Sequence, residues 1–442
     1  MSLADFRART MFGVLAGYLL LNYVFMLFRV PPGIPLGDLG LILCLATINI
    51  PVALRKMGKA VSIAPFLAWW CFGIARAIVD GAGYGEWALR DAAQVFESLW
   101  LIVAFVVAGK ADDVETLFRW IKWLVVAYCI VALGAPFQDD IATISPSIPA
   151  PSSGAPVPLL TPYANIGTML LWIAFYCLTA DHKTRLMRAA ALPVSCILIG
   201  GVVIGFQART SYLQLVALAA LIAVFRPKSL GRSGLVLPVM FIVLGTITAL
   251  DIKIPGRITD EVSFSFIFQH VAAIGGETVG SDEGVIAAAS GVPQRLEWWT
   301  NIFEKLWADP VTFITGLGYG APLTDFVYST GAPVREPHNS FMSVIGRLGI
   351  VGAISWIWLQ IELFKLWRQI FAYYRAVNHQ VWMGRLMLML AYAVLVLAEA
   401  IGEDALEKPF FIVPYYCFWG VILRLAASLT AVRKPALSAM AR

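Results

Sequence analysis

The sequence predicts an all-α, polytopic membrane protein with about twelve transmembrane helices and one large, partly helical outer loop between helices 9 and 10. Three observations lead to this fold class: 59% of the 442 residues are hydrophobic, only 14% are charged, and long apolar segments alternate with short basic ones. A soluble domain carries about 25% charged residues. We therefore expect much of the surface to face lipid.

Twelve apolar segments approach the length of a helical membrane span, which is about 20 residues. In chain order they are Met11–Phe28, Leu36–Leu54, Ala60–Val79, Ala92–Ala108, Phe118–Ala135, Tyr163–Ala180, Leu186–Phe206, Ser211–Phe225, Leu235–Leu250, Ser340–Leu363, Leu386–Ile401 and Phe410–Leu429. The eighth segment is short and follows the seventh closely, so we expect a tight hairpin there. Three regions result: residues 1–250 with helices 1–9, the loop at residues 251–337, and residues 338–442 with helices 10–12 and a short tail.

The lysines and arginines alternate between the two ends of successive spans. If the N-terminus is cytoplasmic, about two-thirds of the 33 basic residues lie on the cytoplasmic side, as the positive-inside rule requires. We expect a multi-pass protein of the cell inner membrane, with both termini in the cytoplasm and residues 251–337 in the periplasm. A basic inner face also explains the net charge of +5, so this charge does not indicate a nucleic-acid partner.

The loop at residues 251–337 is too long for a simple connector, and loops of this length usually carry function. Within it, Gln294–Trp307 has apolar side chains at helical spacing, namely Leu296, Trp299, Ile302, Phe303 and Leu306. This amphipathic helix either lies on the membrane surface or packs on other parts of the loop. We interpret Thr315–Gly320, which reads TGLGYG, as a turn and not as a phosphate-binding loop.

Arginines near membrane depth are energetically expensive, so each should have an acidic partner or an anionic ligand. Arg209 lies in the outward turn of the tight hairpin, with no acid near it in the sequence. Arg295 begins the amphipathic stretch, close to Glu297. Both are candidates for binding an anion. The alternatives are an ion pair for Arg209 and a solvated charge for Arg295.

His338 follows Pro337 at the expected outer end of helix 10. Because proline favours a helix start, we expect His338 in the first helical turn. The positive helix end would there keep the imidazole neutral and able to act as a base. The alternative is a histidine that only caps the helix. The sequence has no cluster of residues with metal-ligand spacing, so we expect neither a metal nor a cofactor.

Residues 335–352 read REPHNSFMSVIGRLGIVG. The Pro-His-Asn start, followed by an apolar helix with a Gly-x-x-Gly pair, resembles the hallmark of the O-antigen ligase and O-antigen polymerase superfamily, and most of all the lipopolysaccharide O-antigen ligases. The order of parts is similar too: about twelve helices, a large periplasmic loop between two late helices, Arg209 before that loop and Arg295 inside it. The resemblance covers roughly Gln207 to Gly352 by motif and the whole chain by topology.

This resemblance implies a glycosyltransferase that works at the periplasmic face. It would move a glycan from undecaprenyl pyrophosphate to a hydroxyl of the lipid A–core sugar, inverting the anomeric carbon without a metal. In a polymerase, the first alternative, the acceptor is a second lipid-linked repeat; the dominance of one outer loop favours the ligase. A transporter of lipid-linked glycans is less favoured, because the polar clusters lie at the outer face and not along the helix centres.

The resemblance also implies roles for the outward arginines. Arg209 and Arg295 would bind the pyrophosphate, since guanidinium groups stabilise the charge that grows on a leaving phosphate. Arg335 and Arg29 are weaker candidates for the same anion. Arg347 either joins this anionic site or pairs with an acid in a neighbouring helix.

In the same scheme His338 is the general base for the acceptor hydroxyl. Asn339 would orient the acceptor or the imidazole ring. The expected partners are therefore the lipid-linked donor, the lipid A–core acceptor and the surrounding membrane lipids.

Overall fold

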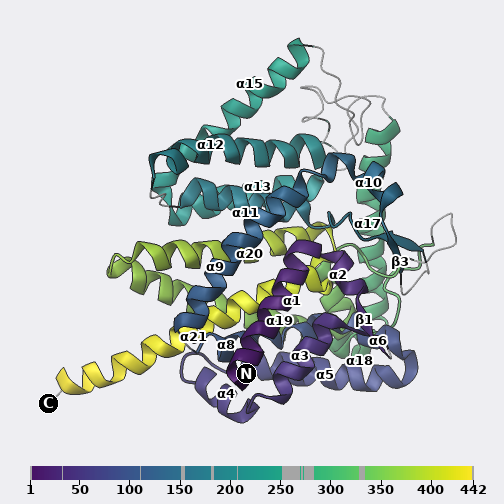
Figure 1. Cartoon of the computed structure of the whole chain (residues 1–442). Helices are drawn as coiled ribbons and strands as arrows, with labels where there is room; N and C mark the ends of the chain where they lie inside the picture. Colours follow the sequence, from purple (N-terminus) through teal and green to yellow (C-terminus); the bar gives the residue numbers. More distant parts are fainter. Residues whose placement is uncertain are drawn as a thin grey trace.

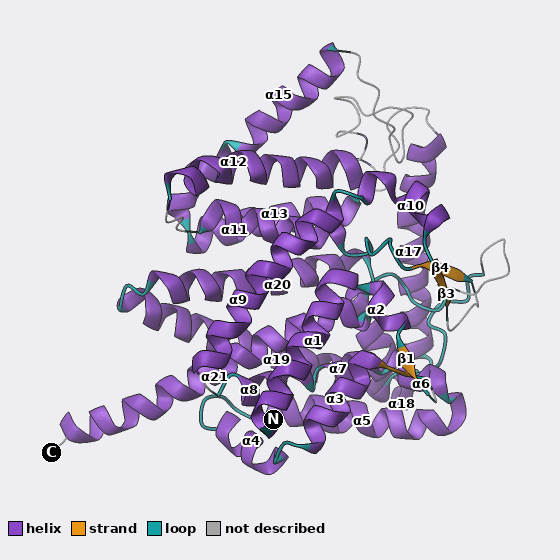
Figure 2. Ribbon diagram, viewed as in Figure 1, coloured by secondary structure: helices purple, strands orange, loops and turns teal. Residues whose placement is uncertain are grey.

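The computed structural model describes residues 2–31, 33–109, 111–150, 155–180, 184–206, 208–250, 283–327 and 334–440, with residues 269 and 272 as isolated points. This part of the chain is mostly helical (Figure 1), which confirms the predicted all-α class. Figure 2 shows how little strand accompanies the helices. The described strands form two antiparallel hairpins, β1 (Arg29–Val30) with β2 (Ile34–Pro35) and β3 (Ser147–Pro149) with β4 (Pro156–Pro158).

The first half of the chain holds α1 (Leu3–Leu21), α2 (Tyr23–Leu27), α3 (Leu36–Ala46), α4 (Ile50–Met57), α5 (Ala64–Tyr84), α6 (Glu86–Asp91), α7 (Ala93–Glu97), α8 (Trp100–Val107), α9 (Ala111–Ala132), α10 (Gln138–Ile144), α11 (Ile166–Thr179) and α12 (Arg185–Gly200). The second half holds α13 (Arg209–Phe225), α14 (Leu230–Gly234), α15 (Val236–Ala249), α17 (Glu283–Trp307), α18 (Pro310–Thr315), α19 (Ser340–Ala376), α20 (Gln380–Gly402) and α21 (Pro409–Met440). Helices suit apolar segments in lipid because each satisfies its own backbone hydrogen bonds.

Among the described residues, six helical segments are long and apolar enough to cross a membrane: Asp113–Ile144, Arg185–Phe206, Pro227–Thr246, Ser340–Ala376, Gln380–Gly402 and Pro409–Leu429. The bent pair of α3 and α4 could add a seventh, and three shorter apolar helices lie at Ala93–Val107, Ile166–Thr179 and Arg209–Phe225. The protein is thus a multi-pass α-helical membrane protein. The number of twelve spans and the large outer loop stay predictions.

The segment Leu36–Leu54, expected as one span, is two helices. α3 and α4 are bent by 88° relative to each other. Asn49 caps the start of α4, its side-chain oxygen accepting a hydrogen bond from the Val52 amide at 3.2 Å, and Pro51 lies in the first turn. A side-chain cap and an early proline are both helix-start signals. They begin a new helix here although the hydropathy of the segment is continuous.

Large aromatic side chains fill the interior of the bundle, and two of the buried indoles donate to backbone carbonyls. The indole nitrogen of Trp172 donates to the carbonyl oxygen of Leu388 at 2.8 Å, and that of Trp367 donates to Leu386 at 2.9 Å. Both indoles are fully buried. α8 packs along α21, α13 along α20, and α5 along α19. These contacts join early and late parts of the chain into one core.

The turn after α18 closes onto α19 through backbone contacts. Gly349 interrupts the helical backbone of α19 with φ 60°, and Gly316 has φ 82°. A Cβ atom on Gly349 would lie 2.5 Å from the Gly316 nitrogen, so no side chain fits between the two chains. The Leu317 amide donates to the carbonyl oxygen of Gly346 at 2.8 Å. Thr315–Gly320 is therefore a turn, as predicted, and it is fixed to α19.

Candidate active site

The main residues selected from the sequence gather at one end of the helical bundle. α13 and α19 begin at this end, α20 ends there, and α17 runs across it (Figure 1). Arg209 is the first residue of α13, Arg295 lies within α17, and His338 precedes the N-cap of α19. Residues far apart in the sequence thus meet at one site.

The start of α19 is capped by Asn339 and not by His338. The Asn339 side-chain oxygen accepts hydrogen bonds from the amides of Phe341 at 2.9 Å and Met342 at 3.1 Å, and its Nδ2 donates to the carbonyl oxygen of Ile401 at 3.0 Å. Backbone groups thus use both ends of this amide, and the expected role of Asn339, orienting the acceptor or the imidazole ring, stays a prediction. His338 lies outside the helix, with φ 49°, and not in its first turn as expected.

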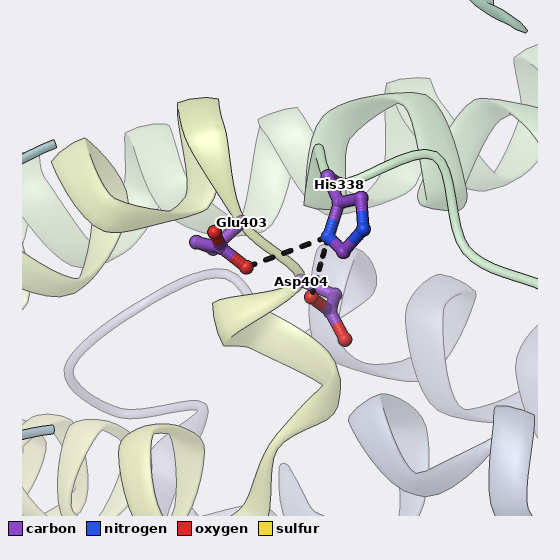
Figure 3. Close-up of side chains that lie close together, drawn as sticks. All are labelled: His338, Glu403 and Asp404. Carbon is purple, nitrogen blue, oxygen red and sulfur yellow. Dashed lines mark ion pairs between the residues drawn. The ribbon is translucent and has the colours of Figure 1, made fainter. Parts of the chain in front are cut away.

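The side chain of His338 faces two carboxylates of the segment after α20. Its Nδ1 lies 3.5 Å from Oε2 of Glu403 and 3.7 Å from Oδ1 of Asp404 (Figure 3). The other ring nitrogen points away from both acids in the same view. The ring also packs near Trp298 of α17, with 6.0 Å between the ring centroids. This arrangement leaves one nitrogen for a substrate and anchors the other.

The expectation of a neutral His338 is wrong. The carboxylates of Asp404 and Glu403 raise the pKa of His338 to about 9, although burial works in the opposite direction. Two carboxylates within 4 Å of Nδ1 favour the charged form of the ring, which is opposite to the effect expected from the positive end of α19. At neutral pH the imidazole is therefore mostly protonated and forms ion pairs.

Lys408 completes this charged cluster. Its Nζ lies 3.2 Å from Oδ1 of Asp404 and 3.7 Å from Oε2 of Glu403. Burial alone would raise the pKa of both acids, but contacts with His338 and Lys408 lower them, so both are ionised at neutral pH. Two anions and two cations balance one another in this cluster. His338, Glu403 and Asp404 also place one potential ligand atom each within 4.8 Å of one another, a spacing that a divalent cation could use.

Arg295 reaches the same cluster from α17. Its Nη1 donates to the carbonyl oxygen of Gly402 at 3.0 Å, and its Nη2 lies 3.9 Å from Oε1 of Glu403. Glu403 thus lies between Arg295 and His338. Arg209 approaches α17: a Cβ atom added to Gly291 of this helix would lie 3.8 Å from the Nη2 atom of Arg209. The side chain of Arg295 is 28% exposed, so a ligand can reach it.

Arg335 and Arg347 take part in a different, buried cluster around Asp91 of α6. Arg347 pairs with Asp91, and the two side chains are only 3% and 1% exposed. Arg335 lies 3.5 Å from the same carboxylate and stacks over Trp87 at 4.3 Å. The amide of Gly320 adds a third contact to Asp91, at 3.0 Å. This cluster fixes the glycine-rich turn, and Arg347 has the acidic partner that the sequence left open.

Arg29 lies in the β1–β2 hairpin, where its Nη1 donates to the carbonyl oxygen of Gly33 at 3.3 Å. Within the described part of the chain, no hydrogen bond or ion pair joins Arg29 or Arg335 to His338. The structure brings Arg209, Arg295 and His338 to one end of the bundle and gives Arg335 and Arg29 other neighbours.

The amphipathic segment Gln294–Trp307 is helical, as predicted, and forms the second half of α17. One side packs inward: Ile302 and Leu306 are buried and contact Leu323 of the following loop. Another side is open, because Phe303 and Trp307 are 39% and 72% exposed. The packed alternative therefore holds for one side of this helix, and the other remains available to lipid.

The site lies at one end of a multi-pass helical membrane protein and combines a histidine, two carboxylates and arginines. Residues 194–357 match the family model described as O-antigen ligase. The match includes Arg209, Arg295 and His338 and confirms the resemblance to the O-antigen ligase superfamily. A search of the curated proteins found no match.

Proposed function

We propose that the protein is an O-antigen ligase: a glycosyltransferase that transfers a glycan from undecaprenyl pyrophosphate to a hydroxyl of a lipid A–core sugar. The family match supports a lipid-linked glycan and a lipid acceptor as substrates. The observation that carries the proposal is the position of His338 against Glu403 and Asp404, with Arg295 on the other side of Glu403. This arrangement places a proton acceptor, His338, next to a group that binds anions, Arg295.

In the proposed reaction the acceptor hydroxyl attacks the anomeric carbon of the donor glycan. The step needs the neutral form of His338, which is the minor form at neutral pH. Its ring nitrogen that faces away from the two acids takes the hydroxyl proton, and Asp404 and Glu403 stabilise the imidazolium that forms, as a carboxylate does beside a catalytic histidine. The anomeric C–O bond breaks, and its electron pair leaves with the pyrophosphate. A single displacement of this kind inverts the anomeric carbon.

Arg295 and Arg209 would stabilise the charge on the leaving pyrophosphate. Guanidinium groups bind phosphate oxygens through two parallel hydrogen bonds, and such donors act strongly where water is partly excluded. In this scheme they supply the positive charge that a metal supplies in other transferases. His338, Glu403 and Asp404 act as a proton-accepting unit and not as metal ligands.

We place the site at the periplasmic face of the inner membrane, with both termini in the cytoplasm. The distribution of basic residues supports this orientation. It puts the N-terminal ends of α13 and α19 and the C-terminal end of α20 on the outer side. The site would then meet both lipid-linked substrates where they share one leaflet.

The test is a transfer assay with the purified full-length protein in detergent, without an ion gradient. A lipid-pyrophosphate-linked glycan and a lipopolysaccharide that lacks O antigen are the substrates, and the product is the extended lipopolysaccharide. A Lys305→Ala variant is the matched control, because Lys305 lies on α17 with Arg295 but forms only an exposed pair with Asp325. Elongation of the lipid-linked donor alone would indicate a polymerase, and movement of the donor without any product would indicate a transporter.

A further inference from the structure

A cavity of about 170 Å³ lies between the starts of α11 and α13 and the last turns of α20. The residues that line it include Tyr163, Asn165, Thr168, Phe206, Thr210, Ser211 and Glu399. These side chains come from three separate helices and their flanking turns. The scheme proposed above assigns no task to any of them.

The cavity adjoins the cluster around His338. The side chain of Thr210 packs against Gly402, since a Cβ atom added to Gly402 would lie 2.5 Å from the Cγ2 atom of Thr210. Gly402 is also the residue whose carbonyl oxygen accepts the hydrogen bond from Arg295. Thr210 is in turn hydrogen-bonded to Glu399. Thr210 therefore lines the cavity and also contacts Gly402, which Arg295 of the proposed reaction centre binds.

Asn165 is a polar group without a full set of partners. It is only 2% exposed, and its Oδ1 accepts a hydrogen bond from Nδ2 of Asn22 at 3.0 Å. Its own Nδ2 has no hydrogen-bond partner among the described residues. A buried donor that stays unpaired costs free energy. Asn165 lines the cavity, so a ligand hydroxyl that reaches this nitrogen would supply the missing acceptor.

The chemistry of the lining selects the kind of ligand. Asn165 offers a donor and Glu399 offers acceptor oxygens, while the aromatic rings of Tyr163 and Phe206 form apolar wall. The acidic side chain of Glu399 disfavours an anion, and the positive ends of α11 and α13 disfavour a cation. A neutral ligand with several hydroxyl groups satisfies both conditions. A cavity of about 150 Å³ holds an unsubstituted six-membered ring. Because this cavity is partly open, the hydroxyl groups of a single sugar ring can extend beyond it.

We propose that this cavity binds one sugar ring of a carbohydrate substrate, with Asn165 and Glu399 hydrogen-bonded to its hydroxyl groups. The inference rests on the proposed function and deepens it by naming a subsite. The ring belongs either to the donor, next to its pyrophosphate, or to the acceptor. Both present the same hydroxyl chemistry, and the two arms of the experiment distinguish them.

The first experiment compares the wild-type protein with Glu399→Gln and Asn165→Ala in the transfer assay. We expect KM for one of the two substrates to rise at least tenfold while kcat changes by less than about threefold. A rise in KM for the donor assigns the ring to the donor, and a rise for the acceptor assigns it to the acceptor. Ser195→Ala is the control, because among the described residues its buried hydroxyl donates to the helix carbonyls of Ala174 and Ala191 and to no ligand-facing group.

The second experiment needs no catalysis, so it separates this inference from the proposed reaction. Binding of the lipid-free core oligosaccharide and of the lipid-free repeat-unit oligosaccharide is measured on the His338→Ala protein with and without Glu399→Gln. We expect one oligosaccharide to bind, and at least tenfold more weakly when Glu399 is replaced. Equal binding in both proteins, or no binding of either oligosaccharide, would overturn the subsite. Glu399→Gln keeps the shape of the side chain, so it tests the idea even if Asn165→Ala fails to fold.

Discussion

The Nδ1 atom of His338 lies 3.5 Å from Oε2 of Glu403, and Nη2 of Arg295 lies 3.9 Å from the other oxygen of the same carboxylate. One acid thus joins the proposed base to a proposed phosphate ligand. A change in the charge of either partner should be felt by the other through this carboxylate.

The transfer rate should depend on pH through His338. Its pKa is raised to about 9 by Asp404 and Glu403, with Lys408 and Arg295 as the neighbouring cations. A base must lose its proton before it can act, so kcat/KM should rise from pH 6 to about pH 9 and then level off. A rate that falls through pH 9 would instead show that the imidazolium form is the active one.

The Asp404→Asn variant should move this profile to lower pH. Removing one carboxylate weakens the stabilisation of the imidazolium, so the pKa of His338 should fall toward its ordinary value of about 6.5. The plateau of kcat/KM should then begin at a lower pH. Because the folded-state pKa of His338 is raised, its ion pairs stabilise the fold fully below about pH 6.5 and lose that effect as pH rises through about 9. An unchanged profile in Asp404→Asn would mean that His338 does not control the rate.

The His338→Ala variant should insert and fold normally but lose most of its activity. General base catalysis is typically worth about 10²–10⁴ in rate. Donor binding should survive, because the arginines provide it. Turnover and donor binding are measured on the same preparation, and a parallel loss of both would show that His338 binds the donor instead of acting as a base.

Arg209→Lys and Arg295→Lys should each lower kcat/KM by about 10²-fold. Lysine keeps the charge but not the planar pair of donors that fits phosphate oxygens. Lys305→Ala on the same helix as Arg295 should stay near wild type, because it removes only an exposed ion pair. Wild-type activity in both lysine variants would place the pyrophosphate elsewhere.

Asp91→Ala should destabilise the protein more than it slows the folded enzyme. It leaves the buried guanidinium of Arg347 unpaired, and breaking a buried pair from one side costs about 3–5 kcal/mol. Thermal unfolding in detergent measures this loss, with Lys305→Ala as the exposed control. A normal unfolding temperature together with lost activity would assign Asp91 to the reaction.

Chelation should leave the transfer rate unchanged, because the proposed scheme uses guanidinium groups and not a metal. The rate is measured before and after exhaustive treatment with a chelator. Loss of activity that one divalent ion restores would contradict this scheme. His338, Glu403 and Asp404 would then be the first residues to examine as ligands, given their spacing.

The sequence predicted the helical class, the amphipathic segment and the meeting of Arg209, Arg295 and His338 at one end. Periodicity and a family motif are local signals, so they locate such residues well. The partners of His338 were not predicted, since Glu403 and Asp404 lie in the segment after α20 and only the packing of α19 against α20 brings them near. The raised pKa of His338 could not be derived without them.

The break between α3 and α4 was missed for a different reason. The signals were present in the sequence, namely Asn49 and Pro51, but an average of hydropathy over a span hides a single capping residue.

The partner of Arg347 was expected only as an acid in some neighbouring helix. Asp91 was not selected because it lies in the short helix α6, outside the long apolar segments.

The backbone contact between Gly316 and Gly349 has a consequence for substrate binding. Through this contact the turn after α18 is fixed to α19, which begins two residues after His338. Because α18 follows α17 directly in the chain, main-chain atoms also hold α17, which carries Arg295, in position against α19. The proposed phosphate ligand and the proposed base are then preorganised before either lipid arrives. Such an enzyme would need no closing step to assemble its reacting groups, and its turnover could be limited by how fast two lipids diffuse in and out of the site.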